Sequence, residues 1–477
     1  MTEDFDAPNN PETHQEIALE ELSDEILSLM LSKLPLQSLA ILSCTSKRMH
    51  RLCHDPQFWT SVKLNDSLSD LTPFSVSVLC GKGAFIRHLC IDLHRTVLPD
   101  SVLHYLACSC PSLVSLSLYM NGDTTLTGTP RVNAFPIDEL AAFLTNSKFI
   151  RSLRFIDSVL IDDSHLVRVL PHLQMMREID LSGCGSLSDS TLIKLAQQCP
   201  SLQILDISRL AITGRCIEQI FRYCGGLRVL RANGCSDFQN DAFDSVHPDY
   251  LKSLTELSLV QTPAGLEQAL ICCVGLKALL ASTSLHDSLL IPFVIQNKNL
   301  EVLHMGSGCR VTIASLLSAI QNCGPHLKSL TFHPYEDFAV PSDEAIRLIC
   351  ANCPKLKFLS LAHSRAISTY WVIQLLEKLK IESLALFGWE DANSSTLRMI
   401  APHVGNLKMF CTTGCKKLTA KGIVNFINAC PKLTVVKFNE TGANVDPNGK
   451  LDPQIIESIR QQFPNVTENP PGTLLLQ

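Results

Sequence analysis

Charged and aromatic side chains are scarce in this sequence, and each scarcity excludes a class of function. Only 18% of the 477 residues are charged and 6% are aromatic, and the net charge is −6. Binding to nucleic acid depends on clustered Lys and Arg and on aromatic platforms for bases, so we expect no such binding. The first basic residue, Lys33, follows nine acidic residues, so we expect no secretory signal. The most apolar stretch, 269–285, is too short to span a membrane and contains Lys277.

The motifs of common catalytic and cofactor-binding sites are also missing. The sequence has no glycine-rich phosphate loop, no Gly-x-Ser-x-Gly and no pair of histidines at metal-ligand spacing. We therefore predict no enzyme activity, no cofactor and no metal. Cys350 and Cys353 form a Cys-x-x-Cys pair, but no second ligand pair follows, so we interpret them as packed thiols. Twenty cysteines without a secretory signal predict reduced thiols and a cytoplasmic or nuclear protein.

A short apolar pattern recurs along most of the chain. It consists of an apolar residue, two variable residues, an apolar residue, one variable residue and a last apolar residue. The first residue of each copy falls at Ile86, Leu113, Ile150, Met176, Leu202, Leu227, Leu254, Leu276, Leu300, Leu327, Leu356, Ile381, Leu407 and Leu433. Nine of the thirteen intervals measure 25–27 residues, a regularity that chance alternation does not produce.

Each copy predicts one strand followed by one helix. The last two apolar positions alternate as in a half-buried strand, and Leu192, Leu195 and Ala196 share one face of a predicted helix over 189–199. One strand and one helix cannot bury their own apolar faces, but stacked neighbours can. The period and pattern resemble the leucine-rich repeat. The resemblance implies an α/β solenoid of about 14 repeats over 65–440, with a curved parallel inner sheet and outer helices.

Nine cysteines occupy two recurring places in this frame. Six lie three residues before the first apolar residue of a copy, at Cys110, Cys199, Cys224, Cys273, Cys353 and Cys430, and three lie eight residues after it, at Cys184, Cys235 and Cys415. A small, weakly polar thiol packs well at a helix end. This placement resembles the cysteine-containing subtype of the leucine-rich repeat.

The segment from Leu22 to Trp59 has a different pattern. Ser23 begins a helix with two acidic residues in its first turn, Leu34-Pro35 ends that helix, and two more short helices follow. The segment resembles an F-box, with Lys47-Arg48-Met49 in the third helix and Trp59 at its end. The resemblance implies binding to the Skp-type adaptor of a cullin–RING ubiquitin ligase.

We predict that the adaptor contacts the apolar residues of this segment: Leu22, Ile26, Leu27, Met30, Leu34, Pro35, Leu39, Leu42 and Trp59. The alternative is a simple N-terminal cap for the solenoid. A cap needs only one apolar face, and this segment is apolar on more than one side. We expect a disordered acidic tail over 1–18, the F-box over 19–64, and a C-terminal cap and tail over 441–477.

Residues two, four and six places after the start of each copy are predicted to point into the concave face. There Arg154, Asp180, Asp206 and Arg231 come from consecutive repeats. They form either a recognition patch or a ladder of charges that neutralise one another.

The later repeats place apolar residues at the same concave positions: Leu280, Val302, Phe358, Phe387 and Met409. Phe358, Phe387 and Met409 fall on three successive strands, so we predict a cluster that binds a partner. The alternative is a register error of one residue, which would bury them.

The combined pattern resembles F-box leucine-rich-repeat proteins. This resemblance implies a substrate-recognition subunit of an SCF-type ubiquitin ligase, which captures protein targets for degradation and partners with the adaptor, a cullin and a RING subunit. The alternative is a non-catalytic scaffold whose F-box recruits no ligase. A small-molecule receptor is a third class, but we find no basic pocket like that of the plant hormone F-box proteins.

Overall fold

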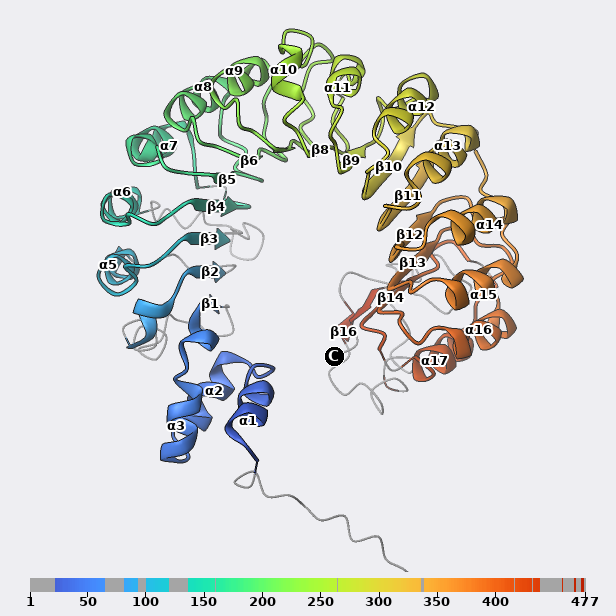
Figure 1. Cartoon of the computed structure of the whole chain (residues 1–477), viewed down its shortest axis with the longest axis horizontal. Coiled ribbons are helices and arrows are strands. Elements are labelled where there is room, and N and C mark those ends of the chain that lie inside the picture. The colour runs from blue at the N-terminus through green and yellow to red at the C-terminus, as the bar shows by residue number, and fades with distance from the viewer. Residues whose placement is uncertain are drawn as a thin grey trace, which may run out of the picture.

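Two kinds of unit follow one another along the chain: a small helical unit and a long series of strand–helix repeats (Figure 1). The computed structural model describes residues 22–64, 81–92, 100–119, 136–158, 160–263, 265–335, 339–415, 417–430, 432–437, 457, 467–468 and 473–475. The tail predicted over 1–18 lies outside the described residues, as does most of the C-terminal segment predicted over 441–477.

The N-terminal unit contains α1 (Asp24–Leu31), α2 (Leu36–Leu42), α3 (Lys47–Cys53) and the 3₁₀ turn η2 (Pro56–Trp59). The backbone N–H of Ile26 donates to the Ser23 hydroxyl at 3.4 Å, and that of Met49 donates to the Ser46 hydroxyl at 3.1 Å. Both α1 and α3 therefore begin at a capping serine. The three α-helices enclose a small apolar core made by Leu27, Leu31, Leu39, Met49, Leu52 and Cys53.

In the part of the chain that the structure describes, fifteen parallel strands follow in chain order, and each pairs with the next. They are β1 (Ser61–Leu64), β2 (His88–Asp92), β3 (Ser115–Tyr119), β4 (Ser152–Ile156), β5 (Glu178–Asp180), β6 (Ile204–Asp206), β7 (Val229–Arg231), β8 (Glu256–Leu259), β9 (Ala278–Ala281), β10 (Val302–Cys309), β11 (Ser329–Pro334), β12 (Phe358–Leu361), β13 (Ser383–Leu386), β14 (Met409–Cys411) and β15 (Val435–Lys437). The fourteen predicted copies correspond to β2–β15. The sequence pattern missed β1, which joins the helical unit directly to the sheet.

The helices pack on the outer side of this sheet, and the strands line the inner side of an open arc (Figure 1). They are α5 (Asp100–Ser109), α6 (Ile137–Asn146), α7 (Asp163–Val169), α8 (Asp189–Gln198), α9 (Cys216–Tyr223), α10 (Pro248–Leu251), α11 (Glu267–Cys272), α12 (Asp287–Gln296), α13 (Ile313–Cys323), α14 (Asp343–Asn352), α15 (Thr369–Lys378), α16 (Ser394–Ile400) and α17 (Ala420–Asn428), with 3₁₀ turns η3 (Gly83–Phe85), η4 (Leu170–His172) and η5 (Ala401–His403). This confirms the predicted α/β solenoid with a parallel inner sheet.

The predicted strand register is correct. In β6 the side chain of Leu205 is buried, whereas its neighbours Ile204 and Asp206 are half-buried on the concave side. Cross-strand pairing links the fourth residue after the start of each copy to its equivalent in the next, as in Asp180 with Asp206 and Asp206 with Arg231. A slip of one residue would have exchanged the buried and concave sets.

The apolar core runs without interruption through the repeats. Leu202, Leu205 and Ile207 of one copy are all at most 1% exposed, and their equivalents in the other copies pack against them. Replacing a leucine in such a core by alanine costs about 2–5 kcal/mol, because both transfer free energy and packing are lost. The stacking of apolar ladders therefore holds the arc together.

Carboxylates at the starts of several outer helices join one repeat to the next. Asp163 and Asp287 accept hydrogen bonds from the backbone N–H groups of Ser188 and Thr312, at 2.9 and 2.8 Å. Asp189 and Asp343 make the corresponding bonds to Thr213 and Ser368. Burial opposes ionisation of Asp287, but hydrogen bonds from Ser315 and Thr312 outweigh it and hold the pKa of this carboxyl below its ordinary value.

The cysteines at the recurring positions are buried between repeats. The Cys199 thiol donates to the Leu173 carbonyl and the Cys184 thiol to the Phe155 carbonyl, both at 3.3 Å. Burial raises the pKa of both thiols to about 12. They are therefore protonated packing groups at neutral pH.

The turn after the strand requires left-handed backbone seven residues after the start of several copies. Gly183 and Gly414 have φ values of 77° and 80°, and non-glycine residues adopt the same conformation at Arg209 and His363, with φ values of 60° and 54°. Glycine carries no steric penalty there. This requirement explains the recurring Gly-Cys pairs, in which the glycine makes the turn and the cysteine packs beneath it.

At the far end of the sheet, β17 (Thr473–Leu475) pairs antiparallel with β15, and β16 (Thr467–Glu468) pairs with β17. An unpaired strand would expose a row of N–H and C=O groups to other chains. The described part of the C-terminal segment thus covers the last parallel strand.

Candidate functional site

The outer side of α1 exposes a stripe of apolar side chains. Ile26, Leu29 and Met30 lie three and four residues apart, which places them on one helical face, and Leu29 is 66% exposed. The opposite face of α1 carries Leu27 and Leu31 into the core. This short helix is therefore apolar on two sides, and among the described residues only the side of Leu27 and Leu31 packs within the chain.

Further exposed apolar residues follow α1 along the chain. Leu34 and Pro35 are exposed in the connection to α2, and Ile41 on α2 is 69% exposed. We call Ile26, Leu29, Met30, Leu34, Pro35 and Ile41 the F-box apolar surface. Leu29 and Ile41 were not among the residues predicted to contact the adaptor, whereas Ile26, Met30, Leu34 and Pro35 were.

Three of the residues predicted to contact an adaptor are instead buried. Leu27 and Leu39 are at most 2% exposed and belong to the core of the helical unit. Trp59 is 2% exposed within the solenoid core, and its Nε1–H donates to the Cys53 carbonyl at 2.8 Å. They support the surface from below, while Leu22 and Leu42 are half-buried at its margin.

Ion pairs fix the orientation of α1 against α3. The Arg48 Nε–H donates to the Asp24 carboxylate at 2.9 Å, and the Arg51 guanidinium donates to its other oxygen at 2.5 Å. The hydrogen bond from Arg48 is the main reason that the pKa of Asp24 lies below its ordinary value. The exposed stripe of α1 is thereby held in one orientation relative to the rest of the unit.

The two arginines of the charged row on the concave face have acidic partners on the next strand. The Arg154 guanidinium forms an ion pair with Glu178, and Arg231 forms one with Glu256 at 2.6 Å and approaches Asp206 at 4.0 Å. Neither glutamate was predicted from the sequence, and each lies two residues after the start of its copy, on the strand next to its arginine.

The two aspartates of this row also have internal partners. The Asp180 carboxylate accepts from the Ser182 backbone N–H at 2.9 Å, and Asp206 accepts from the Ser208 backbone N–H at 3.0 Å. Burial raises the pKa of Asp180 despite these bonds. The four residues are therefore satisfied mainly by neighbours outside the row, and among the described residues Arg231 with Asp206 is the one ion pair within it.

The apolar cluster predicted on the concave face does not form as expected. Phe358 and Met409 are half-buried on either side of Ser383, with which both pair across the sheet. Phe387 lies past the end of β13, where its ring meets the His333 ring edge-on at 5.0 Å. The predicted contact among the three apolar residues is wrong. Phe358 and Met409 lie two residues after the start of their copies and Phe387 lies six residues after it, so they fall at opposite ends of their strands.

Two histidines lie in this region, His304 on β10 and His333 on β11. His333 lies 6.4 Å from His304 between ring centroids and shares a 2.8 Å hydrogen bond with the Ser360 hydroxyl. Burial is the main cause that lowers the pKa of His333 to about 4, so its imidazole is neutral at neutral pH. Leu280 and Val302 are half-buried nearby on β9 and β10, and Leu280 pairs with His304.

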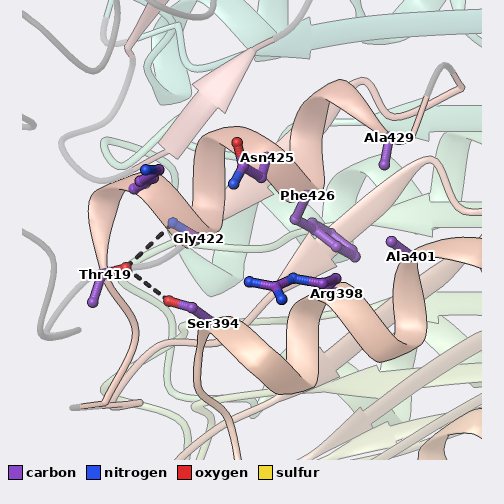
Figure 2. A pocket seen from close by; sticks show the side chains of 9 residues that line it. Ser394, Arg398, Ala401, Thr419, Gly422, Asn425, Phe426 and Ala429 are labelled. Atoms are coloured by element: carbon purple, nitrogen blue, oxygen red, sulfur yellow. Dashed lines mark hydrogen bonds between the residues drawn. The ribbon is translucent and has the colours of Figure 1, made fainter.

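A cavity of about 320 Å³ opens on the outer side, between α16 and α17 (Figure 2). Arg398 and Lys421 line it together with the hydroxyls of Ser394 and Thr419, which lie 2.7 Å apart. Gly422 permits the close approach of the helices, because a Cβ atom there would lie 2.3 Å from the Ser394 oxygen. No carboxylate lines this cavity.

Within the described ranges, no group of three or more His, Cys, Asp or Glu side chains is arranged to hold a metal ion. The helices of the same ranges include none with the length and apolar character needed to cross a bilayer.

Comparisons with known proteins agree with this division of the chain. Residues 20–65 match the F-box-like family model. The whole fold resembles the crystal structure of the complex of Rad7 and Elc1 in yeast, with a TM-score of 0.52 and 17% identity over 84% of this chain and 90% of that chain. The TLR13–ssRNA13 complex matches at a TM-score of 0.40 and 18% identity, over 79% of this chain and 50% of that chain, which is too weak to establish a shared fold. No curated protein matches this sequence.

The chain therefore carries an F-box-like segment followed by a curved α/β solenoid. The Rad7 likeness, at this identity, concerns the fold alone.

Proposed function

We propose that this chain is an F-box leucine-rich-repeat protein of the cysteine-containing subtype and serves as the substrate-recognition subunit of an SCF-type ubiquitin ligase. Its F-box apolar surface binds a Skp-type adaptor, and through the adaptor a cullin and a RING subunit. The solenoid captures target proteins. The ligase partners supply the chemistry, and this chain raises the effective concentration of target lysines near them.

The observation that carries the proposal is the exposure of apolar side chains on both α1 and α2. Leu29 and Ile41 are each about two-thirds exposed, at 66% and 69%, although the unit around them has a complete core. A mere cap for the solenoid would need to be apolar only toward the first repeat. Apolar residues that gather on one surface and are not buried by their own chain mark a partner site.

The experiment replaces Leu29 and Ile41 together by glutamate and measures co-purification with a Skp-type adaptor. We expect adaptor capture to fall at least tenfold, because two charges would enter an apolar interface. Neither side chain belongs to the core, so the unfolding temperature of the helical unit should change little.

The matched control replaces Lys47 by glutamine and Gln57 by glutamate, which makes the same change of two charge units at exposed polar positions. Adaptor capture by this control should equal that of the unchanged chain. Equal capture by both variants would contradict the proposal and favour a scaffold whose F-box recruits no ligase.

A further inference from the structure

The edge of the sheet where the strands begin carries a continuous ladder of hydrogen bonds. In each repeat, the backbone N–H of the residue after the first apolar position donates to the carbonyl of its equivalent in the preceding repeat, at 2.7–2.9 Å. The rungs of this edge ladder are Thr60, Arg87, Val114, Arg151, Arg177, Gln203, Arg228, Thr255, Lys277, Glu301, Lys328, Lys357, Glu382, Lys408 and Thr434. Equivalent side chains thus follow one another at about 5 Å per strand along the arc.

The edge ladder has more basic than acidic residues, whereas the whole chain has more acidic than basic residues. Eight of its fifteen rungs are Lys or Arg and two are Glu, whereas the whole chain has 40 basic and 46 acidic residues. Local positive charge on an acidic protein can act only at short range, because salt screens exposed charges beyond about 10 Å. The basic edge is therefore a local feature.

The later rungs neutralise one another. Lys328 forms an ion pair with Glu301, and Lys357 and Lys408 share Glu382 at 2.7 and 2.8 Å. Hydrogen bonds from the two lysines, led by that from Lys357, lower the pKa of Glu382 to about 2. We call the rungs from Lys277 to Lys408 the lysine half.

The earlier rungs have no such partners. Their charged residues are Arg87, Arg151, Arg177 and Arg228, and no acidic rung lies among them. Among the described residues, none of these four arginines forms an ion pair, although Arg151 donates to the Lys148 and Ile150 carbonyls at 3.0 and 2.7 Å. We call the rungs from Arg87 to Arg228 the arginine half.

Apolar side chains accompany three of these arginines. Phe85, Phe149 and Met175 each lie two residues before an arginine rung and are exposed, Phe149 by 58% and Met175 by 59%. The lysine half has no large exposed apolar residue at the same place: its described equivalents are Gly275, Asn299, His326, Lys355, Lys380 and Asn406. Aromatic residues, Met and Arg are the types enriched at protein interfaces.

Helix dipoles explain only part of this arrangement. The outer helices end near the same edge, and cations there stabilise the negative ends of helices. That effect accounts for basic residues in both halves. It does not account for arginine in place of lysine, for the missing glutamates or for the exposed Phe149 and Met175.

We propose that the arginine half binds an acidic segment of a target protein, with apolar side chains of that segment packing on Phe85, Phe149 and Met175. The inference rests on the proposed function, because it names the class of target that the solenoid captures. The guanidinium group donates in a planar fork that matches a carboxylate, so three or four arginines at this spacing suit an extended Asp- and Glu-rich strand. An extended polypeptide advances about 3.3 Å per residue, and neighbouring rungs lie about 5 Å apart. Successive rungs therefore face residues one or two positions apart in the bound segment.

The test measures binding by fluorescence anisotropy with the full chain. The probe is a labelled 16-residue peptide of Asp and Glu with Leu or Phe at every fourth position. The variant carries R151E, R177E and R228E together, and we expect its affinity for the peptide to fall at least tenfold. A milder variant with glutamine at the same three positions should lose affinity in the same direction, and it keeps the test usable if the triple glutamate variant fails to fold.

The matched control is K328E, K357E and K408E, which changes the charge of the chain by the same amount on the same ladder. It should lose less than twofold in affinity for the peptide. Replacing Phe149 and Met175 by serine should weaken binding about threefold at any salt concentration, since that contact is apolar. A peptide with Asn and Gln in place of Asp and Glu should not bind.

Three outcomes would overturn the inference. They are no binding of the acidic peptide, equal losses in the arginine and lysine variants, or tighter binding of a labelled 16-nucleotide single-stranded DNA that depends on the same arginines. Adaptor co-purification is measured on every variant. Unchanged adaptor capture with lost peptide binding separates a failure of this site from a failure of the proposed function.

Discussion

The exposed face of α1 and the charged row of the concave sheet look like equivalent candidate surfaces in the sequence, but the structure treats them differently. Leu29 on α1 is 66% exposed. On the sheet, Arg154 and Arg231 already have Glu178 and Glu256 as partners. A surface whose side chains are satisfied internally gains little by binding, whereas an uncovered apolar face gains from every contact.

The difference shows how to choose between polar and apolar surfaces as candidate binding sites. The deciding question is whether the chain itself supplies interaction partners for the side chains of that surface. The same criterion separates the two halves of the edge ladder: Lys357 and Lys408 share Glu382, whereas no described carboxylate forms an ion pair with the arginines of the other half.

The largest effect should come from exchanging the two faces of α1. Leu27→Asp places a charge in the core of the helical unit and should unfold that unit, at a cost of several kcal/mol. Leu29→Asp places the same charge on the exposed face and should cost less than about 0.5 kcal/mol. Limited proteolysis between 22 and 60 reports both. Equal protease sensitivity would mean that the assignment of the two faces is wrong.

A smaller effect should follow from removing one half-buried carboxylate that accepts hydrogen bonds from the next repeat. Asp287 accepts hydrogen bonds from the Thr312 N–H, the Thr312 hydroxyl and the Ser315 hydroxyl. Asp287→Ala should destabilise the solenoid by about 2 kcal/mol, because hydrogen bonds to a charged group are strong and their donors are left without a partner. Denaturant unfolding measures this loss, and Asp343→Ala, with its bond to Ser368, is the milder comparison.

The contribution of Asp287 should depend on pH in a defined direction. Its pKa is lower in the folded chain than in the unfolded chain, so the unfolded state takes up the proton first. The stabilisation is therefore complete above about pH 4 and is lost as the pH falls through the folded pKa. The stability difference between the unchanged chain and Asp287→Ala should shrink on acidification, and a difference that grows would contradict the assignment.

The smallest effect should appear on the concave face. A double-mutant cycle with Arg231→Ala and Glu256→Ala should give a coupling of about 0.5 kcal/mol, since the pair is partly exposed. Target capture should survive both changes. A large loss of capture with an intact fold would restore this row as a recognition patch.

The apolar part of the concave face remains a proposed target surface. Phe358→Ser with Met409→Ser should leave the unfolding temperature within a few degrees, because both residues are only half-buried. A moderate loss of target capture is expected, and Phe387→Ser serves as the comparison because Phe387 packs on His333 instead. A large drop in unfolding temperature would show that Phe358 and Met409 act as core residues.

Much of the fold could be predicted because each repeat places its buried apolar residues at fixed intervals in the sequence, which is the strongest local signal of structure. Leu205 and Asp206 were assigned to opposite sides of one strand from alternation alone, and their burial agrees. The pattern could not reveal β1, since Ser61–Leu64 is the end of the helical unit and lacks the start of a copy.

The surfaces were harder to predict because they depend on distances between repeats. Nothing local to Arg231 indicates that Glu256, twenty-five residues later, lies within 2.6 Å of it. The buried role of Leu27 and Leu39 was missed for a similar reason, since a helix that is apolar on two sides does not show which side the chain itself covers.

The central claim is that the F-box apolar surface recruits a Skp-type adaptor, and hydrogen exchange on the purified pair tests it most directly. We predict a one-to-one complex in which backbone exchange slows in α1 and α2 and stays unchanged in β2–β15. A chain that forms no complex with the adaptor, or a complex that protects the solenoid and leaves α1 and α2 unprotected, would contradict the account.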